Sequence, residues 1–468
     1  MSNTKREWLP LYSFYDRSGL SRHLEEMAAK GWMLESLGAY SWRYRRIEPK
    51  QLKFSVTYFP TASQFDSHPS AEQELFWEFC AEAGWELVAS SAQVQIFCNE
   101  QENPVPLETD PISEYDTIRR SMKRGPLTSF GLLLLLCVFE IAFGLWRVWN
   151  DPVDTLSSSS SLSASFGWVP LLLLVCVELI RSCLWLKRAK AAADANLPLP
   201  DLRSAKGLGI LVLAVTALEF LWMLLSAFRA SHRMLVVMLV VTGFFFLLFC
   251  LSNSVLKVAK KLRFSRRVNM ALTLSVIAIL SAVMMAGMMA VVLRVDGNLL
   301  EDHPPVESYE YNGMTWDVYA DPLPLTIGEL IDTDYDRWST RLIQNKSPLL
   351  THLQARQRPR MDALDQPDLE YEIVIVHAPF LYDLCKNHFV NWLERDNDKL
   401  PEEYWDIYQS VDPTLWGAVE AYQRCSSGEP INQFLICWPD RIVEIDFDWE
   451  WTITKELISI AAEQLKHA

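Results

Sequence analysis

The chain has 468 residues, of which 50% are hydrophobic, and its 43 basic and 58 acidic side chains give a formal net charge of −15. This charge is unevenly divided, with −4 in residues 1–126, +8 in residues 127–293 and −19 in residues 294–468. Direct nucleic-acid binding requires clustered Lys and Arg that displace counterions, so the acidic ends argue against it. The 9 cysteines form no disulfide framework, although one bridge among the cysteines of the tail stays open.

Residues 1–118 contain an internal repeat with an offset of 53 positions. The first half is predicted to form a strand over residues 11–15, a helix opened by Ser18 or Gly19, and a strand over residues 32–47. The second half is predicted to form a strand over residues 52–59, a helix over residues 71–83 capped by Ser70, and a strand over residues 85–98. Two βαβ units in tandem predict a ferredoxin-like α+β domain, with one antiparallel sheet and two helices on one face.

The repeat is anchored by Gly31 and Trp32 in the first half and by Gly84 and Trp85 in the second. Each glycine is predicted to end its helix, because glycine adopts the left-handed conformation without a Cβ penalty. The tryptophans are predicted to pack the helices against the sheet, and the alternative is that they stack on a ligand.

Three runs carry a resemblance to a known family: YDRSGLSRHLEEMAAKGWMLE, YRRIEPKQLKFSVTYFP and AEAGWELVASSAQVQIF. Over roughly residues 9–110 the chain resembles the bacterial domain-of-unknown-function family numbered 2812. The resemblance implies a module at the N-terminus of a membrane protein, often encoded beside a PadR-like transcription regulator. It implies no particular activity.

Residues 119–293 contain five apolar segments, at about 127–149, 167–186, 207–228, 234–251 and 270–293. A helix that spans the bilayer needs about 20 apolar residues, so each segment is predicted to be a transmembrane helix. Residues 1–20 are polar and aromatic, and therefore the first span is expected to serve as the insertion signal.

Lys and Arg residues in the short loops predict the orientation of these helices. Fifteen of them lie before the first segment, between the second and third, and between the fourth and fifth, whereas the other two loops hold two. By the positive-inside rule the N-terminus is cytoplasmic, and five crossings place the C-terminal domain outside. The predicted location is the cell membrane.

Three glutamates lie inside the first three apolar segments, as Glu140, Glu178 and Glu219. A carboxylate in the bilayer is costly, so such residues are expected to face the interior of the bundle. One hypothesis is a shared proton or cation site. The alternative is a structural role in holding helices together, with Arg181 as a local partner of Glu178.

The fifth segment carries small residues every four positions: Ala278, Ala282, Ala286 and Ala290. This spacing allows close helix approach, so it predicts packing within the bundle or in a homodimer.

Residues 294–468 are predicted to form an acidic α+β domain. Asn312-Gly313 predicts a hairpin, and further strands are expected over residues 369–377, 433–438 and 441–446. Helices are expected over residues 379–395, 414–424 and 455–466, the last capped by Thr454.

No catalytic or metal motif is recognisable in the chain. His377, Cys385 and His388 do not match a zinc spacing, and Asp332, Asp334 and Asp336 lack the glycine and distal glutamate of a calcium loop. We therefore expect no metal and no cofactor.

The leading functional hypothesis is a non-enzymatic signalling or regulatory membrane protein. The outer domain would sense or bind a ligand, and the cytoplasmic module would contact a protein partner such as a PadR-like regulator. The alternatives are a small proton- or cation-coupled transporter that uses the glutamates, and a membrane assembly scaffold.

Overall fold

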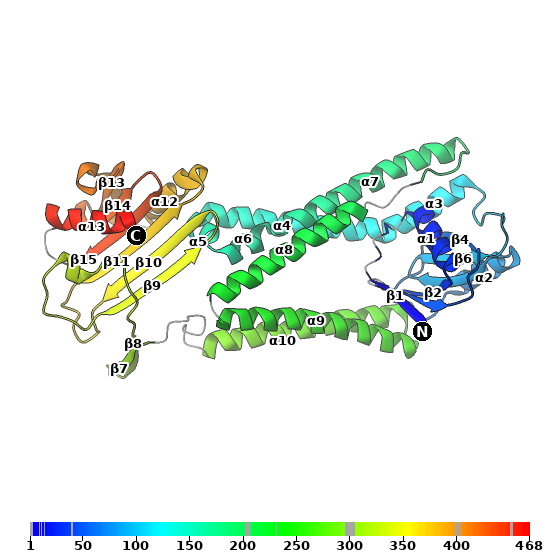
Figure 1. The fold of residues 1–468 in the computed structure, drawn as a ribbon, viewed down its shortest axis with the longest axis horizontal. Helices are drawn as coiled ribbons and strands as arrows, with labels where there is room; N and C mark the ends of the chain where they lie inside the picture. Colours follow the sequence, from blue (N-terminus) through cyan, green and yellow to red (C-terminus); the bar gives the residue numbers. More distant parts are fainter. Residues whose placement is uncertain are drawn as a thin grey trace. The chain divides into compact units, whose positions relative to one another are not determined.

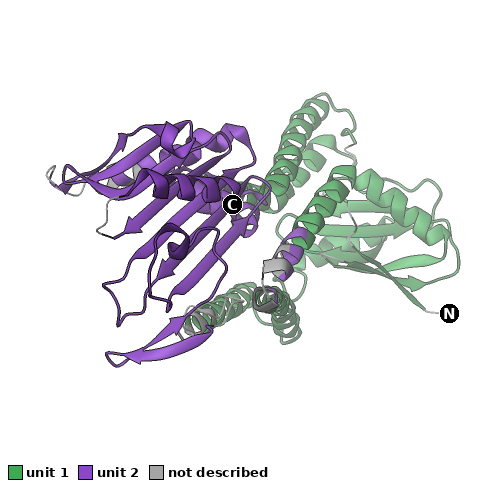
Figure 2. Ribbon diagram, turned by 60° about the vertical axis from the view of Figure 1, so that its left-hand side comes forward, with its two compact units in different colours: residues 1–139, 168–221, 236–296 green, residues 140–167, 222–235, 297–468 purple. Residues whose placement is uncertain are grey.

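The computed structural model describes all residues except 1–2, 9, 11, 14, 39–40, 202–205, 231, 295–304, 398–400, 402–403 and 450–452. The chain forms two compact units (Figure 2). Unit 1 consists of residues 1–139, 168–221 and 236–296, and unit 2 of residues 140–167, 222–235 and 297–468.

The N-terminal module of unit 1 consists of two copies of a β-α-β-β pattern (Figure 1). The first copy contains β1 (Thr4–Trp8), α1 (Arg17–Ala29), β2 (Trp32–Leu37) and β3 (Ser41–Arg46). The second contains β4 (Lys53–Tyr58), α2 (Ala71–Glu82), β5 (Glu86–Ser91) and β6 (Val94–Asn99). Each copy forms an antiparallel three-stranded sheet, in the orders β1-β3-β2 and β4-β6-β5.

The repeat therefore has the predicted helices but a different strand arrangement. Gly31 and Gly84 follow the two helices at φ +80° and +83°, and the Ser70 hydroxyl accepts from the Gln73 N–H at the start of α2. The single predicted strand after each helix is instead a hairpin, and the first strand is β1; of the strand predicted over residues 11–15, residues 11 and 14 lie outside the described residues, and residues 12, 13 and 15 are not in a strand. Two three-stranded sheets replace the one expected sheet, and a ferredoxin-like fold is not confirmed.

The five predicted spans are helices: α4 (Pro126–Asn150), α7 (Val169–Asp194), α8 (Lys206–Ala230), α9 (His232–Lys261) and α10 (Arg266–Arg294). Among the described residues, five helical segments are long and apolar enough to cross a membrane. The 26 residues of α7 would extend about 39 Å at 1.5 Å per residue, more than the bilayer core of about 30 Å. One end of α7 is therefore available for contacts outside an apolar layer.

Shorter helices flank the first span. α3 (Pro111–Arg124) precedes α4 and begins at Asp110, whose carboxylate accepts from the N–H groups of Ile112 and Ser113. α5 (Pro152–Ser157) and α6 (Ser159–Phe166) follow α4 in unit 2. Gly144 of α4 allows a close approach to α6, since a Cβ at this position would lie 2.6 Å from the Ser165 Cβ.

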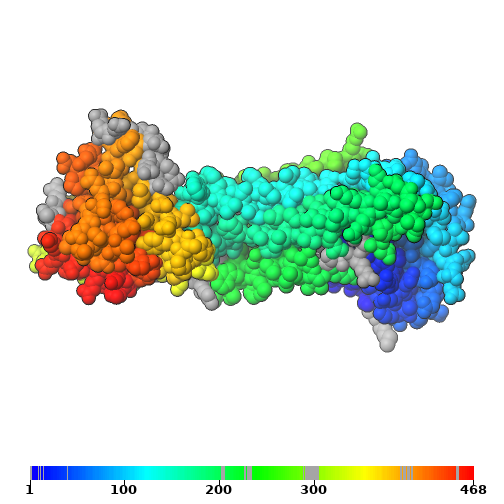
Figure 3. All heavy atoms as spheres, turned by 90° about the horizontal axis from the view of Figure 1, so that it is seen from above, coloured from blue at the N-terminus to red at the C-terminus, as the bar shows by residue number. Residues whose placement is uncertain are grey.

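The C-terminal domain of unit 2 is built on a seven-stranded antiparallel sheet. Its order is β12 (Asp406–Ser410), β13 (Glu420–Ser426), β14 (Glu429–Cys437), β15 (Arg441–Asp448), β11 (Asp368–Val376), β10 (Leu350–Arg358) and β9 (Ser339–Lys346). The other elements are β7 (Glu307–Tyr311), β8 (Met314–Val318), α11 (Ile327–Leu330), η2 (Pro379–Leu381), α12 (Tyr382–Asn397), η4 (Pro413–Trp416) and α13 (Lys455–His467). In the space-filling view, the orange and red residues of β12 to α13 form one packed body (Figure 3).

Most of the predicted elements of this domain are present. Asn312 and Gly313 connect β7 and β8 at φ 52° and 75°, and the Thr454 hydroxyl caps α13. The helix predicted over residues 414–424 is wrong, because this stretch holds η4 and most of β13. Pairing of β13 with β12 and β14 outweighs the local helical pattern.

Candidate functional site

The polar contacts that hold the N-terminal module to the apolar helices α7 and α10 and to the polar helix α3 form the candidate functional site. They occur at three places, on α7, on α3 and at the start of α10. We name them the α7 contact (Tyr15, Glu178, Ser182), the α3 contact (Arg17, Glu108, Glu114) and the α10 contact (Asp66, Arg266, Asn269).

The α7 contact is a buried hydrogen-bond group. The Tyr15 hydroxyl donates to Glu178 Oε2 at 2.7 Å, and the Ser182 hydroxyl lies 3.1 Å from the Tyr15 oxygen. Burial, together with the adjacent Glu178 carboxylate, raises the pKa of Tyr15 to about 12, so the phenol remains a donor. One turn further along α7, the Trp185 ring stacks on Tyr15 with 6.1 Å between the ring centroids. This stretch of α7 is thus part of the core of the module.

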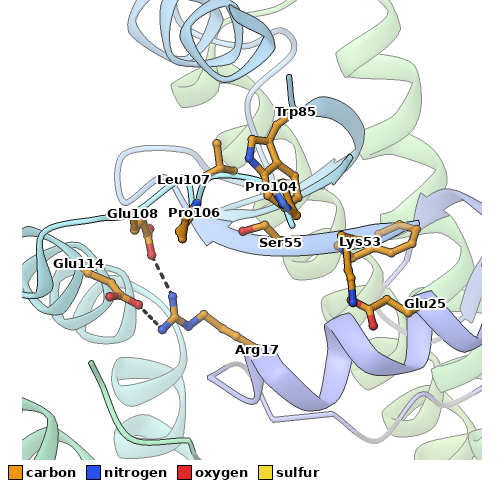
Figure 4. A pocket seen from close by; sticks show the side chains of 11 residues that line it. Arg17, Glu25, Lys53, Ser55, Trp85, Pro104, Pro106, Leu107, Glu108 and Glu114 are labelled. Carbon is orange, nitrogen blue, oxygen red and sulfur yellow. Dashed lines mark hydrogen bonds and ion pairs between the residues drawn. The ribbon is translucent and has the colours of Figure 1, made fainter. Parts of the chain in front are cut away.

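The α3 contact centres on one guanidinium (Figure 4). Arg17 Nη1 lies 2.9 Å from Glu108 Oε2, and Nη2 pairs with Glu114 of α3. Beside these groups is a cavity of about 320 Å³, also lined by Lys53 and Trp85. Burial raises the pKa of Glu108 to about 7, and the attraction of Arg17 offsets only part of this effect. Arg17 therefore joins the start of α1 to α3 and to the segment before it.

The α10 contact involves the loop that precedes α2. Asn269 is fully buried, and its side-chain N–H group donates to the Phe65 carbonyl oxygen at 2.8 Å and to the Ser67 hydroxyl at 2.9 Å. Arg266 donates to the Thr61 carbonyl oxygen at 3.2 Å and lies 4.0 Å from Asp66. The turn between α9 and α10 is thereby held by the second copy of the repeat.

Replacing Glu108 by Gln should leave stability nearly unchanged at pH 5 and raise it at pH 8 by about 1 kcal/mol. The pKa of Glu108 is raised in the folded state, so the folded protein holds a proton that the unfolded chain releases, and stability falls as pH rises from about 4.5 through 7. Gln cannot ionise, so the variant avoids this loss of stability, which amounts to about 1.4 kcal/mol for each unit by which folding raises the pKa. The variant also lacks the ion pair with Arg17, and this offsets part of the gain. Thermal unfolding of the variant and the unaltered protein at both pH values tests this, and a variant no more stable than the unaltered protein at pH 8 would contradict it.

Unit 2 contains a comparable contact of its own, between α5 and the sheet. His352 of β10 is 2% exposed; its Nδ1 lies 3.2 Å from Asp154 Oδ1 of α5, and its Nε2 lies 3.3 Å from Glu372 Oε2 of β11. Burial disfavours the charged ring, but the two carboxylates outweigh burial and raise the pKa of His352 to about 9. A protonated imidazolium therefore joins α5 to the sheet at neutral pH.

Further contacts reinforce this attachment of α5. The Ser347 hydroxyl donates to the Leu156 carbonyl oxygen at 2.6 Å, and His388 of α12 lies 3.8 Å from Asp151. Val153 and Leu156 are buried in a cluster with residues of β10, β11 and α12. The C-terminal domain thus binds the segment between the first two apolar helices.

The predicted intramembrane residues have different surroundings. Glu178 is 9% exposed and bonded to the module, and Arg181 is half-buried. Glu140 and Glu219 are also half-buried, and no hydrogen bond joins either of them to a side chain among the described residues. The structure thus pairs Glu178 with Tyr15, and the shared glutamate site stays a prediction.

The regularly spaced alanines of α10 and the tryptophans of the internal repeat differ in burial. Ala278, Ala282 and Ala286 are exposed, and the side chain of Ala290 lies outside the described residues. Trp85 is buried and donates from Nε1 to the Val105 carbonyl oxygen at 2.8 Å. Trp32 is half-buried, with the Arg46 guanidinium 4.9 Å from its ring centroid. Both tryptophans therefore pack within the module.

The histidines and cysteine considered for metal binding have separate partners. His377 Nε2 lies 2.9 Å from the Thr351 hydroxyl, Cys385 is buried in the apolar cluster, and His388 faces Asp151. Within the part of the chain that the structure describes, no three His, Cys, Asp or Glu side chains could hold a metal ion together. The acidic run of Asp332, Asp334 and Asp336 is exposed.

Sequence reasoning missed the partners in all these contacts, namely Tyr15, Arg17, Asn269, Asp154 and His352. Tyr15 and Glu178 lie 163 positions apart, and no local pattern links such residues. A weak signal was available for two of them. Asn269 is a polar residue at the start of an apolar segment, and His352 alternates with apolar residues in a strand.

Five helices that could span a membrane, with β-sheet elements on both sides of them in the sequence, define the class of protein. Residues 20–130 match the family described as "Protein of unknown function (DUF2812)", which confirms the resemblance for the N-terminal module and α3. Neither the curated proteins nor the solved structures gave a significant match.

Proposed function

We propose that the protein is a non-enzymatic regulatory membrane protein that couples an extracytoplasmic domain to a cytoplasmic partner-binding module. The observation that carries the proposal is that each folded domain binds its own set of segments at the ends of the apolar helices. The N-terminal module binds α3, α7 and the α9–α10 turn, and the C-terminal domain binds α5. A change in either domain would therefore act directly on helix ends.

The distribution of these contacts supports the proposed orientation. The module binds residues next to the loops that are rich in Lys and Arg, since the Ser18 hydroxyl donates to Asp201 and the loop before α2 accepts from Asn269 at the turn before α10. The C-terminal domain binds the serine-rich loop over residues 151–166, which has neither Lys nor Arg. Loops of the two kinds alternate along the chain, as the positive-inside rule requires for a cytoplasmic module and an outer domain.

The surroundings of Glu178 favour regulation over transport. Its carboxylate is occupied by the Tyr15 hydroxyl, and Trp185 next to it lies in the core of the module. A carboxylate held in this way joins a helix to a domain, and no observed contact links it to Glu219. The transporter and scaffold hypotheses remain predictions from sequence.

Continuous helices provide a path for the coupling. α4 and α8 each contain residues of both units, so each connects the units through the covalent chain. The proposed partner of the module is a cytoplasmic protein, and a PadR-like regulator is the candidate that the family resemblance implies. If the two domains are coupled, loss of the contacts of one domain must change the contacts of the other.

Weakening the contact of α5 should therefore loosen the contacts of the N-terminal module. In the full-length protein in lipid nanodiscs, His352→Gln is expected to speed hydrogen exchange of residues 61–67 at least two-fold. His467→Gln, which alters an exposed histidine on α13 of the same domain, is the matched control and should have no such effect. Faster exchange confined to α5 and β10 would show a local contact without coupling and would contradict the proposed function.

A further inference from the structure

Helix α2 leaves two large apolar side chains on its outer face. Leu75 and Phe79 are one turn apart, and each is 67% exposed. The inner face is well packed: Phe76 lies edge-on to Phe97, and Trp77 Nε1 donates to Gln95 Oε1 at 2.5 Å. α2 lies at the outer edge of the module in Figure 1. The core of the module therefore does not account for Leu75 and Phe79.

The other copy of the repeat shows what the fold itself requires at these positions. With the offset of 53, Leu75 and Phe79 correspond to Arg22 and Glu26 of α1, which are both exposed. The inner positions of α1, Leu24 and Met27, are buried, and their counterparts on α2 are the half-buried Trp77 and the buried Cys80. The same helix register thus carries polar outer residues in one copy and apolar ones in the other. The apolar pair is specific to α2.

The charges around the apolar pair indicate what could cover it. Glu72, Glu78 and Glu82 are exposed and lie at helical spacing on either side of Leu75 and Phe79. The helix contains neither Lys nor Arg. Because the cytoplasmic surface of a membrane is negatively charged, it repels a face of this kind. A positively charged protein surface with apolar side chains complements it.

We propose that the outer face of α2, formed by Leu75, Phe79 and these glutamates, is a docking surface for a basic amphipathic helix of a cytoplasmic protein. Apolar residues at i and i+4 match the spacing at which a partner helix presents its own apolar stripe. The small size of the surface indicates weak, reversible binding. This inference deepens the proposed function, since it relies on the module being cytoplasmic.

The test uses the full-length protein in zwitterionic nanodiscs and a fluorescent 18-residue helical peptide of Leu and Lys. Binding of the peptide is expected to be saturable and to weaken at least ten-fold in Leu75→Arg/Phe79→Glu, which introduces the residues of the first copy. A matched peptide with Glu in place of Lys should not bind. Arg22→Ala/Glu26→Ala is the control pair and should bind the basic peptide like the unaltered protein.

Equal binding of the basic peptide by Leu75→Arg/Phe79→Glu and the unaltered protein would overturn the proposal. It would also be overturned if the unaltered protein were dimeric and this variant monomeric by light scattering, since a second copy would then occupy the face. Unchanged hydrogen exchange of β4–β6 confirms that the variant is folded. None of these readouts depends on coupling to the C-terminal domain, so failure here is distinguishable from failure of the proposed function.

Discussion

Replacing His352 by Gln is expected to destabilise the C-terminal domain at pH 7. The unaltered domain should lose stability as pH rises from about 6.5 to 9, and the variant should lack most of this pH dependence. The pKa of His352 is raised in the folded state, so its contribution is complete below the usual value of 6.5 and disappears as pH rises through about 9. Breaking a buried ion pair costs about 3–5 kcal/mol. The exposed Asp154 carboxylate is screened, which reduces the expected cost to about 2 kcal/mol.

The measurement is hydrogen exchange of α5, β10 and β11 in the full-length protein at pH 6.5 and pH 9.5. The unaltered protein should exchange faster at the higher pH, after correction for intrinsic rates, whereas the variant should exchange fast at both. His467→Gln is the control. A variant with the same pH dependence as the unaltered protein would exclude His352 as the titrating group.

Replacing Arg17 by Met should release the N-terminal module from α3, with an effect that grows with pH. Arg17 pairs with both Glu108 and Glu114, and removing the shared cation from a largely buried site costs about 3–5 kcal/mol. At low pH Glu108 holds a proton, which limits the cost. Arg17 lowers the pKa of Glu108, so the variant keeps this proton to a higher pH than the unaltered protein; once it is lost, two carboxylates face each other without a cation.

Thermal unfolding and exchange of residues 111–118 at pH 6 and 8 test this expectation. Arg22→Met, at an exposed position of the same helix, is the matched control. Adding Glu108→Gln to Arg17→Met should restore part of the stability at pH 8. If Arg17→Met lost the same small amount of stability relative to the unaltered protein at both pH values, the α3 contact would be an ordinary surface ion pair.

Local sequence patterns predicted the elements whose ends are marked by a glycine, a capping residue or a turn motif. Pairing between segments distant in the sequence determined the other elements. The glycines after α1 and α2, the Ser70 cap and the Asn312-Gly313 turn each lie where the sequence indicated. The β5–β6 hairpin was missed because its turn contains Ala92 at φ 48° and has no glycine. In the candidate site the glutamate was predictable as a polar residue on an apolar helix. Its partner Tyr15 was not, since the two meet only after the module has packed on α7.

The internal duplication has a consequence for the geometry of the helices. The segment before α1 supplies Tyr15 to α7, and the segment before α2 supplies the Asn269 acceptors at the turn between α9 and α10. Related parts of the two copies thus bind α7 and the α9–α10 turn, while two hydrophobic clusters fill the copies themselves. The N-terminal module therefore acts as a spacer whose width, set by its own packed side chains, fixes how far apart those helix ends lie. A ligand or partner that altered this width would move both ends at once.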